Sequence, residues 1–318
     1  MTTSPDYRNT RFWEKLSRIR AGQYRTGDFM IADAKDVDVA GGVPSMGRCR
    51  DETTGASGRL RTRPEFLDQV RELIRQDVLD IMLSSTATIE QLTDEGVFDE
   101  TRVLSAFRGN EATDAWVGIR GGRYRDFPPR PYRGAALEFA RAPLCLYSVT
   151  YINDAEHDAS SLETYARFRA EARANDKMHF LEVFNPNVET GIAEDQIGFF
   201  INDCVIRTLA SLTRRERPEF LKVAYNGPAS LEELAGHDPS MVIGVLGGGQ
   251  RHPSRYLRAP VPGRAVWRAA GSFRTQDQWF GRPVRHDPVD ETRGRSGCER
   301  RRSRTGLSRR SAEAGARS

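Results

Sequence analysis

Lysine is scarce in this chain, and several common motifs are missing altogether. The 318 residues include four lysines beside 44 arginines, and four cysteines with no Cys-x-x-Cys pair and no metal-ligand spacing. No apolar run approaches the roughly 20 residues of a membrane-spanning helix, and the first residues lack the apolar core of a signal peptide. Dinucleotide, P-loop, Gly-x-Ser-x-Gly and His-Glu-x-x-His patterns are absent too. These absences predict a cytoplasmic protein with reduced cysteines, no membrane contact, no metal and no cofactor.

The positive charge of the chain lies at one end of it. Residues 1–248 carry a net charge of −7, whereas residues 249–318, with 17 arginines and no lysine, carry +11. The acidic body lacks the basic surface that nucleic acids require, so we expect no nucleic-acid partner for it. The change in composition predicts a globular domain over residues 1–248 and a basic tail of low order over residues 249–318.

Apolar strands alternate with helices throughout the body. The spacing of Phe12, Leu16 and Ile19 predicts an amphipathic N-terminal helix, which we expect to act as a lid. Seven strands that are apolar on both faces are then predicted, at residues 29–32, 79–83, from Asp114 onward, 144–152, 178–186, 220–228 and 241–249. Strands buried on both faces and separated by helices indicate a parallel α/β fold. Their order fits a (β/α)8 TIM barrel lacking a proper eighth β/α unit, and an open doubly wound sheet is the alternative.

Lys222, in "EFLKVAYNGP", is the strongest chemical signal. A charged amine is costly inside an apolar strand unless it is paired or neutralised, and lysine, unlike arginine, can lose its proton and act as a nucleophile. This predicts a Schiff-base amine, with a buried ion pair as the alternative. Glu182 lies on the preceding strand, and strand alternation directs it into the barrel. A carboxylate there would move protons for Lys222 or simply pair with it.

Two further groups follow predicted strands. Three aspartates and a lysine in the segment Asp33–Asp38 come after the first strand, at the end of a barrel where active sites gather. Such a cluster could bind Mg²⁺ or supply a general acid/base, and Asp33, the closest to the strand, is our candidate for that role. Gly247 and Gly248 end the seventh strand, where backbone N–H groups could approach a phosphate.

These segments resemble the class I aldolases related to archaeal-type fructose-bisphosphate aldolase and deoxyribose-phosphate aldolase. "MHFLEVFNP", "FLKVAYNGP" and "MVIGVLGGG" are similar to strands five to seven of that family, and "MIADAKD" to strand one. The resemblance implies that Lys222 forms a Schiff base with a small phosphorylated sugar or keto compound, that Asp33 assists, and that Gly247 and Gly248 hold the phosphate. A homo-oligomer is also possible. Archaeal-type enzymes often carry a tyrosine acid/base near the end of strand five, where this chain has Asn185.

Two other functions stay open at this point. One is a Mg²⁺-dependent barrel lyase or isomerase that uses the Asp33–Asp38 cluster. The other is a non-catalytic phosphometabolite-binding or assembly protein, which a closed ion pair between Lys222 and Glu182 would favour.

The tail lacks the eighth strand of the family, whose Gly-Arg clamp would hold the phosphate. Its many arginines and absent lysines are typical of a GC-rich gene translated in the wrong frame. In the neighbouring frame, degenerate codons allow residues 273–279 to spell Phe-Gly-Arg-Lys-Ile-Asn-Gly. We therefore hypothesise a single-base frameshift near Gly248 or Gly249, with a natural Arg-rich interaction tail as the alternative. A lost eighth unit would leave strands one and seven with unpaired edges and would weaken activity.

Overall fold

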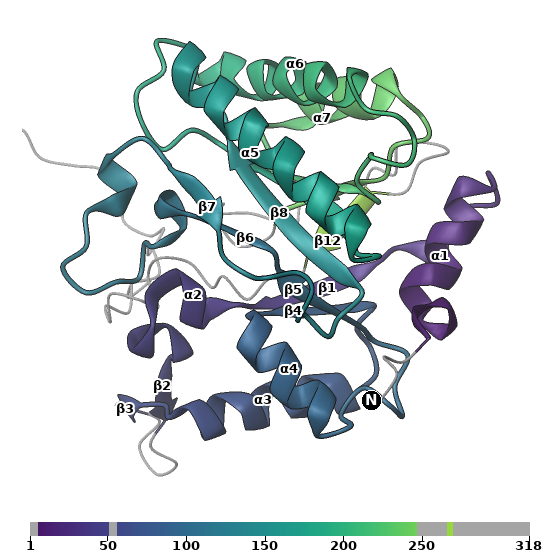
Figure 1. The fold of residues 1–318 in the computed structure, drawn as a ribbon, viewed down its shortest axis with the longest axis vertical. Helices are drawn as coiled ribbons and strands as arrows, with labels where there is room; N and C mark the ends of the chain where they lie inside the picture. Colours follow the sequence, from purple (N-terminus) through teal and green to yellow (C-terminus); the bar gives the residue numbers. More distant parts are fainter. Residues whose placement is uncertain (1–5, 51–55, 247–265, 270–318) are drawn as a thin grey trace, which may run out of the picture. The chain divides into compact units, whose positions relative to one another are not determined.

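The computed structural model describes residues 6–50, 56–246 and 266–269, and its centre is a closed barrel of parallel strands (Figure 1). The barrel strands are β1 (Ile31–Lys35), β4 (Ile81–Ser84), β5 (Leu104–Arg108), β8 (Leu144–Thr150), β9 (Met178–Phe184), β10 (Leu221–Val223), β11 (Ile243–Val245) and β12 (Val266–Ala269). They follow one another around the barrel in the order β1-β12-β11-β10-β9-β8-β5-β4. The predicted TIM-barrel fold class is confirmed.

Helices cover the outside of the barrel, as the alternating sequence pattern predicts. Figure 1 has α5, α6 and α7 together on one side of the strands and α3 and α4 on the other. The helices are α1 (Arg11–Arg20), α2 (Val37–Gly41), α3 (Arg63–Arg75), α4 (Thr86–Asp94), α5 (Ala155–Ala174), α6 (Ile197–Ala210) and α7 (Pro228–His237). A capping box between Thr62 and Glu65 fixes the start of α3.

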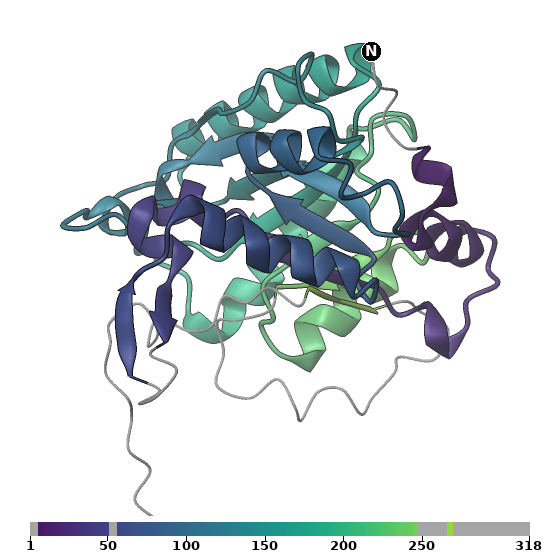
Figure 2. The same cartoon turned by 90° about the horizontal axis from the view of Figure 1, so that it is seen from below.

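Short elements decorate the barrel. Two antiparallel hairpins pair β2 (Arg48–Arg50) with β3 (Ser57–Leu60) and β6 (Asn110–Ala112) with β7 (Pro131–Arg133). The 3-10 helices are η1 (Tyr7–Asn9), η2 (Thr26–Asp28), η3 (Val43–Met46), η4 (Thr113–Ala115), η5 (Tyr124–Asp126) and η6 (Glu194–Gln196). Seen after a 90° turn, α3 runs alongside the barrel strands while the hairpin of β2 and β3 projects from it (Figure 2).

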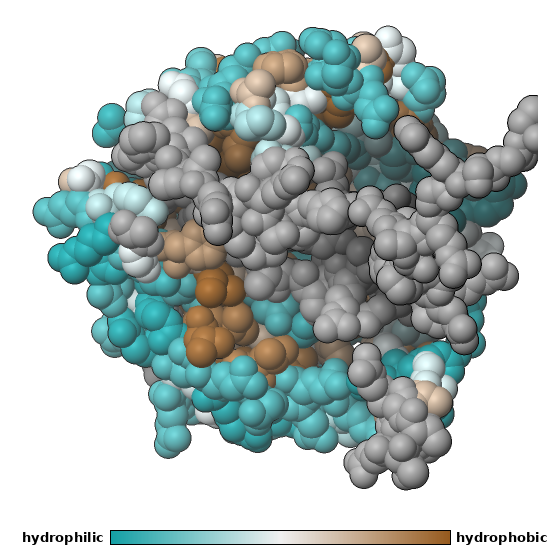
Figure 3. All heavy atoms as spheres, turned by 180° about the vertical axis from the view of Figure 1, so that it is seen from behind, coloured by the Kyte–Doolittle hydropathy of each residue, from teal (hydrophilic) through white to brown (hydrophobic). Residues whose placement is uncertain are grey.

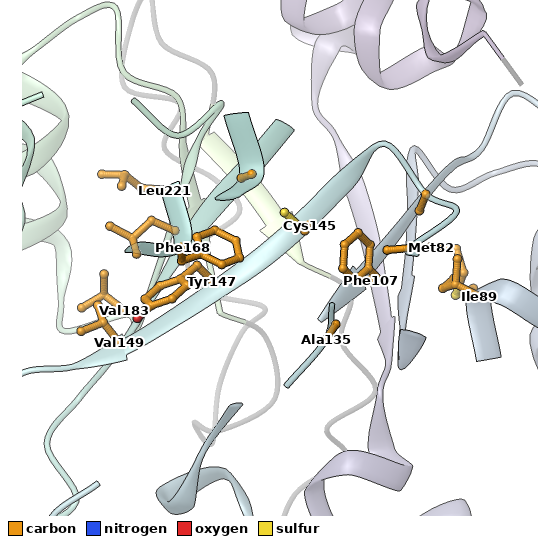
Figure 4. Close-up of a cluster of buried hydrophobic side chains, with 14 of the residues drawn as sticks. Met82, Ile89, Phe107, Ala135, Cys145, Tyr147, Val149, Phe168, Val183 and Leu221 are labelled. Carbon is orange, nitrogen blue, oxygen red and sulfur yellow. The ribbon is translucent and has the colours of Figure 1, made fainter. Parts of the chain in front are cut away.

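The core has two parts because each barrel strand buries both of its faces. Outward-facing side chains such as Met82, Phe107 and Tyr147 pack beneath the helices (Figure 4). Inward-facing side chains such as Ile81, Leu146 and Phe180 fill the barrel interior. Truncating a buried side chain of this size costs about 2–5 kcal/mol, so both parts contribute to stability. Among the coloured residues of Figure 3, an apolar area at the lower left borders hydrophilic residues, and smaller apolar areas lie near the top of the view.

Helix α1 closes the amino-terminal end of the barrel. Phe12 is fully buried, and its ring centroid lies 6.0 Å from that of Phe220, which comes just before β10. Lys15 Nζ donates to Asp80 Oδ2 at 3.0 Å, immediately before β4. Barrel active sites lie at the opposite, carboxyl-terminal end of the strands. The expectation that this helix acts as a lid is therefore wrong, and α1 is a plug at the barrel floor.

The third barrel strand lies earlier in the sequence than predicted. It is β5, whereas residues from Asp114 onward form η4, η5 and turns. The backbone of this stretch finds its partner outside the barrel sheet, since Gly118 N donates to Ala40 O at the end of α2. The apolar residues of β5 were overlooked because the run is short and ends in Arg108.

Residues 109–133, here called the rim segment, follow β5 at the carboxyl-terminal end of the barrel, and residues 134–143 lead back to the start of β8. Asn187, which follows β9, donates its amide to Arg125 O at 3.0 Å and Phe127 O at 2.8 Å. His157 lies near the start of α5, and its Nε2 is 2.6 Å from Pro129 O in the rim segment. The rim segment is thus fastened to elements that follow three different barrel strands.

A short strand occupies the eighth place of the barrel. β12 pairs in parallel with both β11 and β1, through Ile243↔Val266 and Ile31↔Arg268. The expectation of unpaired edges on strands one and seven is therefore wrong. A short stretch of the tail, Val266–Ala269, pairs with both edges. Gly247 and Gly248 of the predicted domain lie outside the described residues, as do residues 249–265 and 270–318 of the predicted tail.

Candidate active site

Lys222 and Glu182 form a buried ion pair inside the barrel. They lie opposite each other on the paired strands β10 and β9, and Lys222 Nζ is 2.5 Å from Glu182 Oε1. Their side chains are 8% and 2% exposed. Phe220 and Phe180 come two residues before Lys222 and Glu182 in the sequence, and their rings stack with centroids 4.4 Å apart. Because alternate residues share a face, the two phenyl rings form an apolar floor beneath the ion pair.

A small cavity adjoins Lys222. Its volume is about 20 Å³, and Asp33 and Gly244 also line it. Gly244 pairs with Lys222 in the β10–β11 register, so no side chain crowds the lysine from that strand. A cavity of this size holds about one water molecule. The structure thus brings two of the predicted site residues, Asp33 and Lys222, to the edge of the same space.

Arg108 extends the ion pair into a network that the sequence analysis missed. From the end of β5, its Nη2 lies 3.7 Å from Glu182 Oε2 and its Nε lies 2.6 Å from Asp36 Oδ2. Burial opposes the charged form of this arginine, but the carboxylates of Asp36 and Glu182 outweigh burial and raise its pKa. The sequence signal for Arg108 is that this arginine directly follows a short apolar run. The prediction missed it because it placed the third strand from Asp114 onward.

The Asp33–Asp38 cluster is divided among separate partners. Asp33 pairs with Lys35 at 3.1 Å, and Asp36 is the member that pairs with Arg108. Asp38 accepts a hydrogen bond from Ser85 Oγ at 2.6 Å, and burial raises its pKa, which disfavours the ionised form that a cation needs. The described residues contain no group of three or more His, Cys, Asp or Glu side chains arranged to hold a metal ion. The arrangement therefore gives no support to the Mg²⁺ alternative.

Amide and hydroxyl groups complete the carboxyl-terminal end of the site. Ser148 Oγ lies 3.3 Å from Arg108 Nη1, and the Asn110 amide bonds both backbone groups of Ser148. Asn185 and Asn226 exchange two amide hydrogen bonds of 2.7 and 2.9 Å. A carboxamide does not titrate near neutral pH. Asn185 therefore cannot replace a tyrosine as an acid/base.

The structure is similar to solved aldolases. It matches an archaeal fructose 1,6-bisphosphate aldolase with a TM-score of 0.55 and 14% identity, over 82% of this chain and 91% of that one. It matches the fructose-bisphosphate aldolase from Slackia heliotrinireducens with a TM-score of 0.54 and 12% identity, over 85% and 83% of the two chains. A protein from Corynebacterium glutamicum matches with a TM-score of 0.50 and 19% identity, over 85% and 90%.

Sequence comparison adds nothing to these matches, because no protein-family model and no curated protein sequence matches the chain. None of the described helices is both long and apolar enough to cross a membrane. The resemblance to archaeal-type aldolases is confirmed at the level of structure, and the chain has the barrel fold of these aldolases.

Proposed function

We propose that this protein is a class I aldolase-type lyase in which Lys222 forms a Schiff base with a small phosphorylated sugar or keto compound. One observation carries the proposal: a lysine inside the barrel lies beside both a carboxylate, at 2.5 Å, and a cavity. A nucleophilic amine needs a nearby group to take its proton and a space for the carbonyl carbon. The aldolase fold of the chain is in keeping with this chemistry.

The proposed reaction begins with transfer of a proton from Lys222 to Glu182. The neutral amine then attacks the substrate carbonyl carbon, and the resulting carbinolamine loses water to give an iminium ion. The bond between the α and β carbons then breaks. Its electron pair forms a C=C bond to the former carbonyl carbon as the C=N pair moves to nitrogen, while a base takes the hydroxyl proton of the leaving aldehyde. A proton returned to the α carbon of the resulting enamine restores the Schiff base. Asp33 and Glu182 are the proposed bases. Water finally hydrolyses the Schiff base and frees Lys222.

The substrate phosphate is proposed to bind the backbone of Gly247 and Gly248. We also propose that the altered tail weakens this binding, because its sequence has no strand pattern that ends in the family's Gly-Arg clamp. A chain with the frame restored after Gly248 should then bind phosphorylated substrates more tightly than the present chain. Activity of the two chains on fructose 1,6-bisphosphate and on 2-deoxyribose 5-phosphate compares them directly.

Borohydride trapping tests the Schiff base. The protein is incubated with each carbonyl substrate, reduced, digested and mapped by mass spectrometry. With only four lysines in the chain, the labelled residue is unambiguous. We expect an adduct at Lys222 that Lys222→Met abolishes. Lys177→Met is the matched control, since Lys177 bonds the carbonyls of Ala140 and Ala142 near the barrel floor. An adduct at another lysine, or none in the frame-restored chain, would overturn the proposal.

A phosphometabolite-binding protein without catalysis is the second candidate. The short distance between Lys222 and Glu182 favours it, because an ammonium group held by a carboxylate is not a nucleophile. This candidate predicts saturable binding of sugar phosphates, measured by calorimetry, with no reducible adduct.

A further inference from the structure

Arg108 is a buried cation that packing alone does not explain. It ends β5, where Leu104 and Ala106 precede it on the same face, and its side chain is 7% exposed. Burying a guanidinium group costs free energy that an apolar residue at the same place would not cost. The charged groups around Arg108 supply a chemical reason for burying its guanidinium group.

Arg108 belongs to a row of four alternating charges. Asp36 holds Arg108 at 2.6 Å, Arg108 lies 3.7 Å from Glu182, and Glu182 lies 2.5 Å from Lys222. The two Glu182 oxygens face different cations: Oε1 faces Lys222 and Oε2 faces Arg108. Oε2 is buried and accepts no hydrogen bond from the described residues. Arg108 and Lys222 therefore act on the same carboxylate.

We propose that Arg108, held by Asp36, is a positioning residue that controls how readily Lys222 gives up its proton. This inference rests on the proposed Schiff-base role of Lys222. The charge of Arg108 repels the Lys222 ammonium and draws the Glu182 carboxylate away from it, and both effects favour loss of the lysine proton to solvent. Because Arg108 also stabilises the ionised carboxylate, it makes Glu182 a weaker acceptor of that proton. Asp36 partly cancels that charge. Arg108 and Asp36 thus act on Lys222 in opposite directions.

Other charged groups face the same network from neighbouring elements. Asp33, on β1, lines the cavity beside Lys222 and pairs with Lys35. Glu111, on β6, and Asp114, on η4, interact electrostatically with Arg108. These groups are the same in every variant below. A difference between variants therefore reports on Asp36 and Arg108.

The test measures the reactivity of each lysine without any substrate. Full-length protein is methylated with formaldehyde and cyanoborohydride between pH 6 and 9, and each lysine is quantified by mass spectrometry. Because formaldehyde reacts with the neutral amine, we expect Arg108→Gln to slow methylation of Lys222 at pH 7.5 by about tenfold, equivalent to one pH unit. Asp36→Asn should accelerate it. Arg108→Lys keeps the charge and should stay close to wild type.

Lys177 is the internal control, since it lies at the other end of the barrel and its reactivity should be the same in all proteins. Opposite shifts at Lys222 support the inference. Shifts in one direction only, or none beyond that of Lys177, overturn it. If circular dichroism reveals that Arg108→Gln does not fold, Asp36→Asn decides: faster methylation supports the inference, and unchanged or slower methylation overturns it.

Failure of the proposed function has a different signature. If the frame-restored chain forms no borohydride-trapped adduct, yet the two variants have opposite shifts, the protein is not an aldolase but does have the electrostatic coupling. A protein that forms the adduct but has no opposite shifts is an aldolase in which Arg108 only supports the structure.

Discussion

Lys222 and Glu182 face each other across paired parallel strands, with Nζ and Oε1 2.5 Å apart in the barrel interior. Two charges buried so deeply depend on each other, because removing Glu182 leaves Lys222 without this counter-charge and removing Lys222 leaves Glu182 with Arg108 at 3.7 Å. The pair therefore links the chemistry of the site to the stability of the barrel.

Removing either partner should destabilise the protein more than removing both. We expect Lys222→Met or Glu182→Gln alone to lower the free energy of unfolding by about 3–5 kcal/mol, the usual result of leaving a buried charge unpaired. The double variant should recover part of that loss. Urea unfolding of the four proteins gives the coupling energy. Effects that simply add would mean that the two side chains do not interact in solution.

His179 should make the protein sensitive to acid. Burial, with Arg169 as a smaller cause, lowers its pKa to about 3, and its Nε2 lies 2.9 Å from the Tyr165 hydroxyl. An unfolded histidine titrates near pH 6.5, so from there down to about pH 3 the unfolded chain binds a proton that the folded chain excludes. Stability is therefore full above pH 6.5 and falls with pH by about 1.4 kcal/mol per unit.

The measurement is urea unfolding between pH 7 and pH 4. At pH 5 the histidine accounts for a loss of about 2 kcal/mol relative to pH 7. His179→Asn should remove this part of the pH dependence, whereas the exposed His237→Asn should leave it in place. An unchanged slope in His179→Asn would assign the acid sensitivity to other groups.

Gly41→Ala should disturb the rim segment. A Cβ at this position would lie 2.6 Å from Gly118 Cα and would also clash with Ser45 Oγ. Overpacking of this kind costs about 1–3 kcal/mol. We expect a lower melting temperature and faster proteolysis within residues 118–127. Gly27→Ala, where a Cβ meets nothing within 4 Å, is the matched control. Equal protease resistance in the two variants would contradict the contact.

Asp80→Ala should loosen the barrel floor. The Asp80 carboxylate pairs with Lys15 at 2.9 Å and accepts a hydrogen bond from Ile31 N at 2.7 Å, and its side chain is 1% exposed. We expect a loss of about 3–5 kcal/mol in chemical unfolding. Asp68→Ala breaks an exposed ion pair with Arg71 and should cost less than about 1 kcal/mol. Similar losses in both variants would mean that burial is not the cause.

The frameshift hypothesis is decided by the nucleotide sequence of the gene. We expect the neighbouring frame after the Gly248 codon to stay open and to encode a strand that ends in Gly-Arg. An early stop codon in that frame would leave a natural Arg-rich tail as the explanation of residues 249–318.

Strand patterns were readable from the sequence where the strand was long or carried an unusual residue. β8 and β9 each have seven residues, almost all buried, and Lys222 marks β10 because a lysine is out of place among Leu221 and Val223. The five residues of β5 had no such mark, and the aromatic rim segment after it has a more strand-like composition. Residue composition is a poor predictor of strands where the backbone of a loop forms its hydrogen bonds with other loops and not with a sheet.

The candidate site was predictable only in part, for a geometric reason. Alternation along a strand indicates that Glu182 and Lys222 point inward, and adjacent strands bring them together. Contacts between strands far apart in sequence depend on how the barrel closes, which alternation does not report. Arg108 and Asp36 are 72 positions apart, and they meet because β1 and β5 both pair with β4.

Helix α1 packs at the amino-terminal end of the barrel, opposite the carboxyl-terminal end where barrel active sites lie. Among the described residues, every side chain of the buried inner cluster lies between Phe12 and Val242, within the predicted body of the chain. The described part of the tail contributes backbone pairing through β12. Under the frameshift hypothesis, the side chains that fill the barrel interior would be encoded ahead of the altered frame, so a base change that restored the frame would leave their sequence untouched.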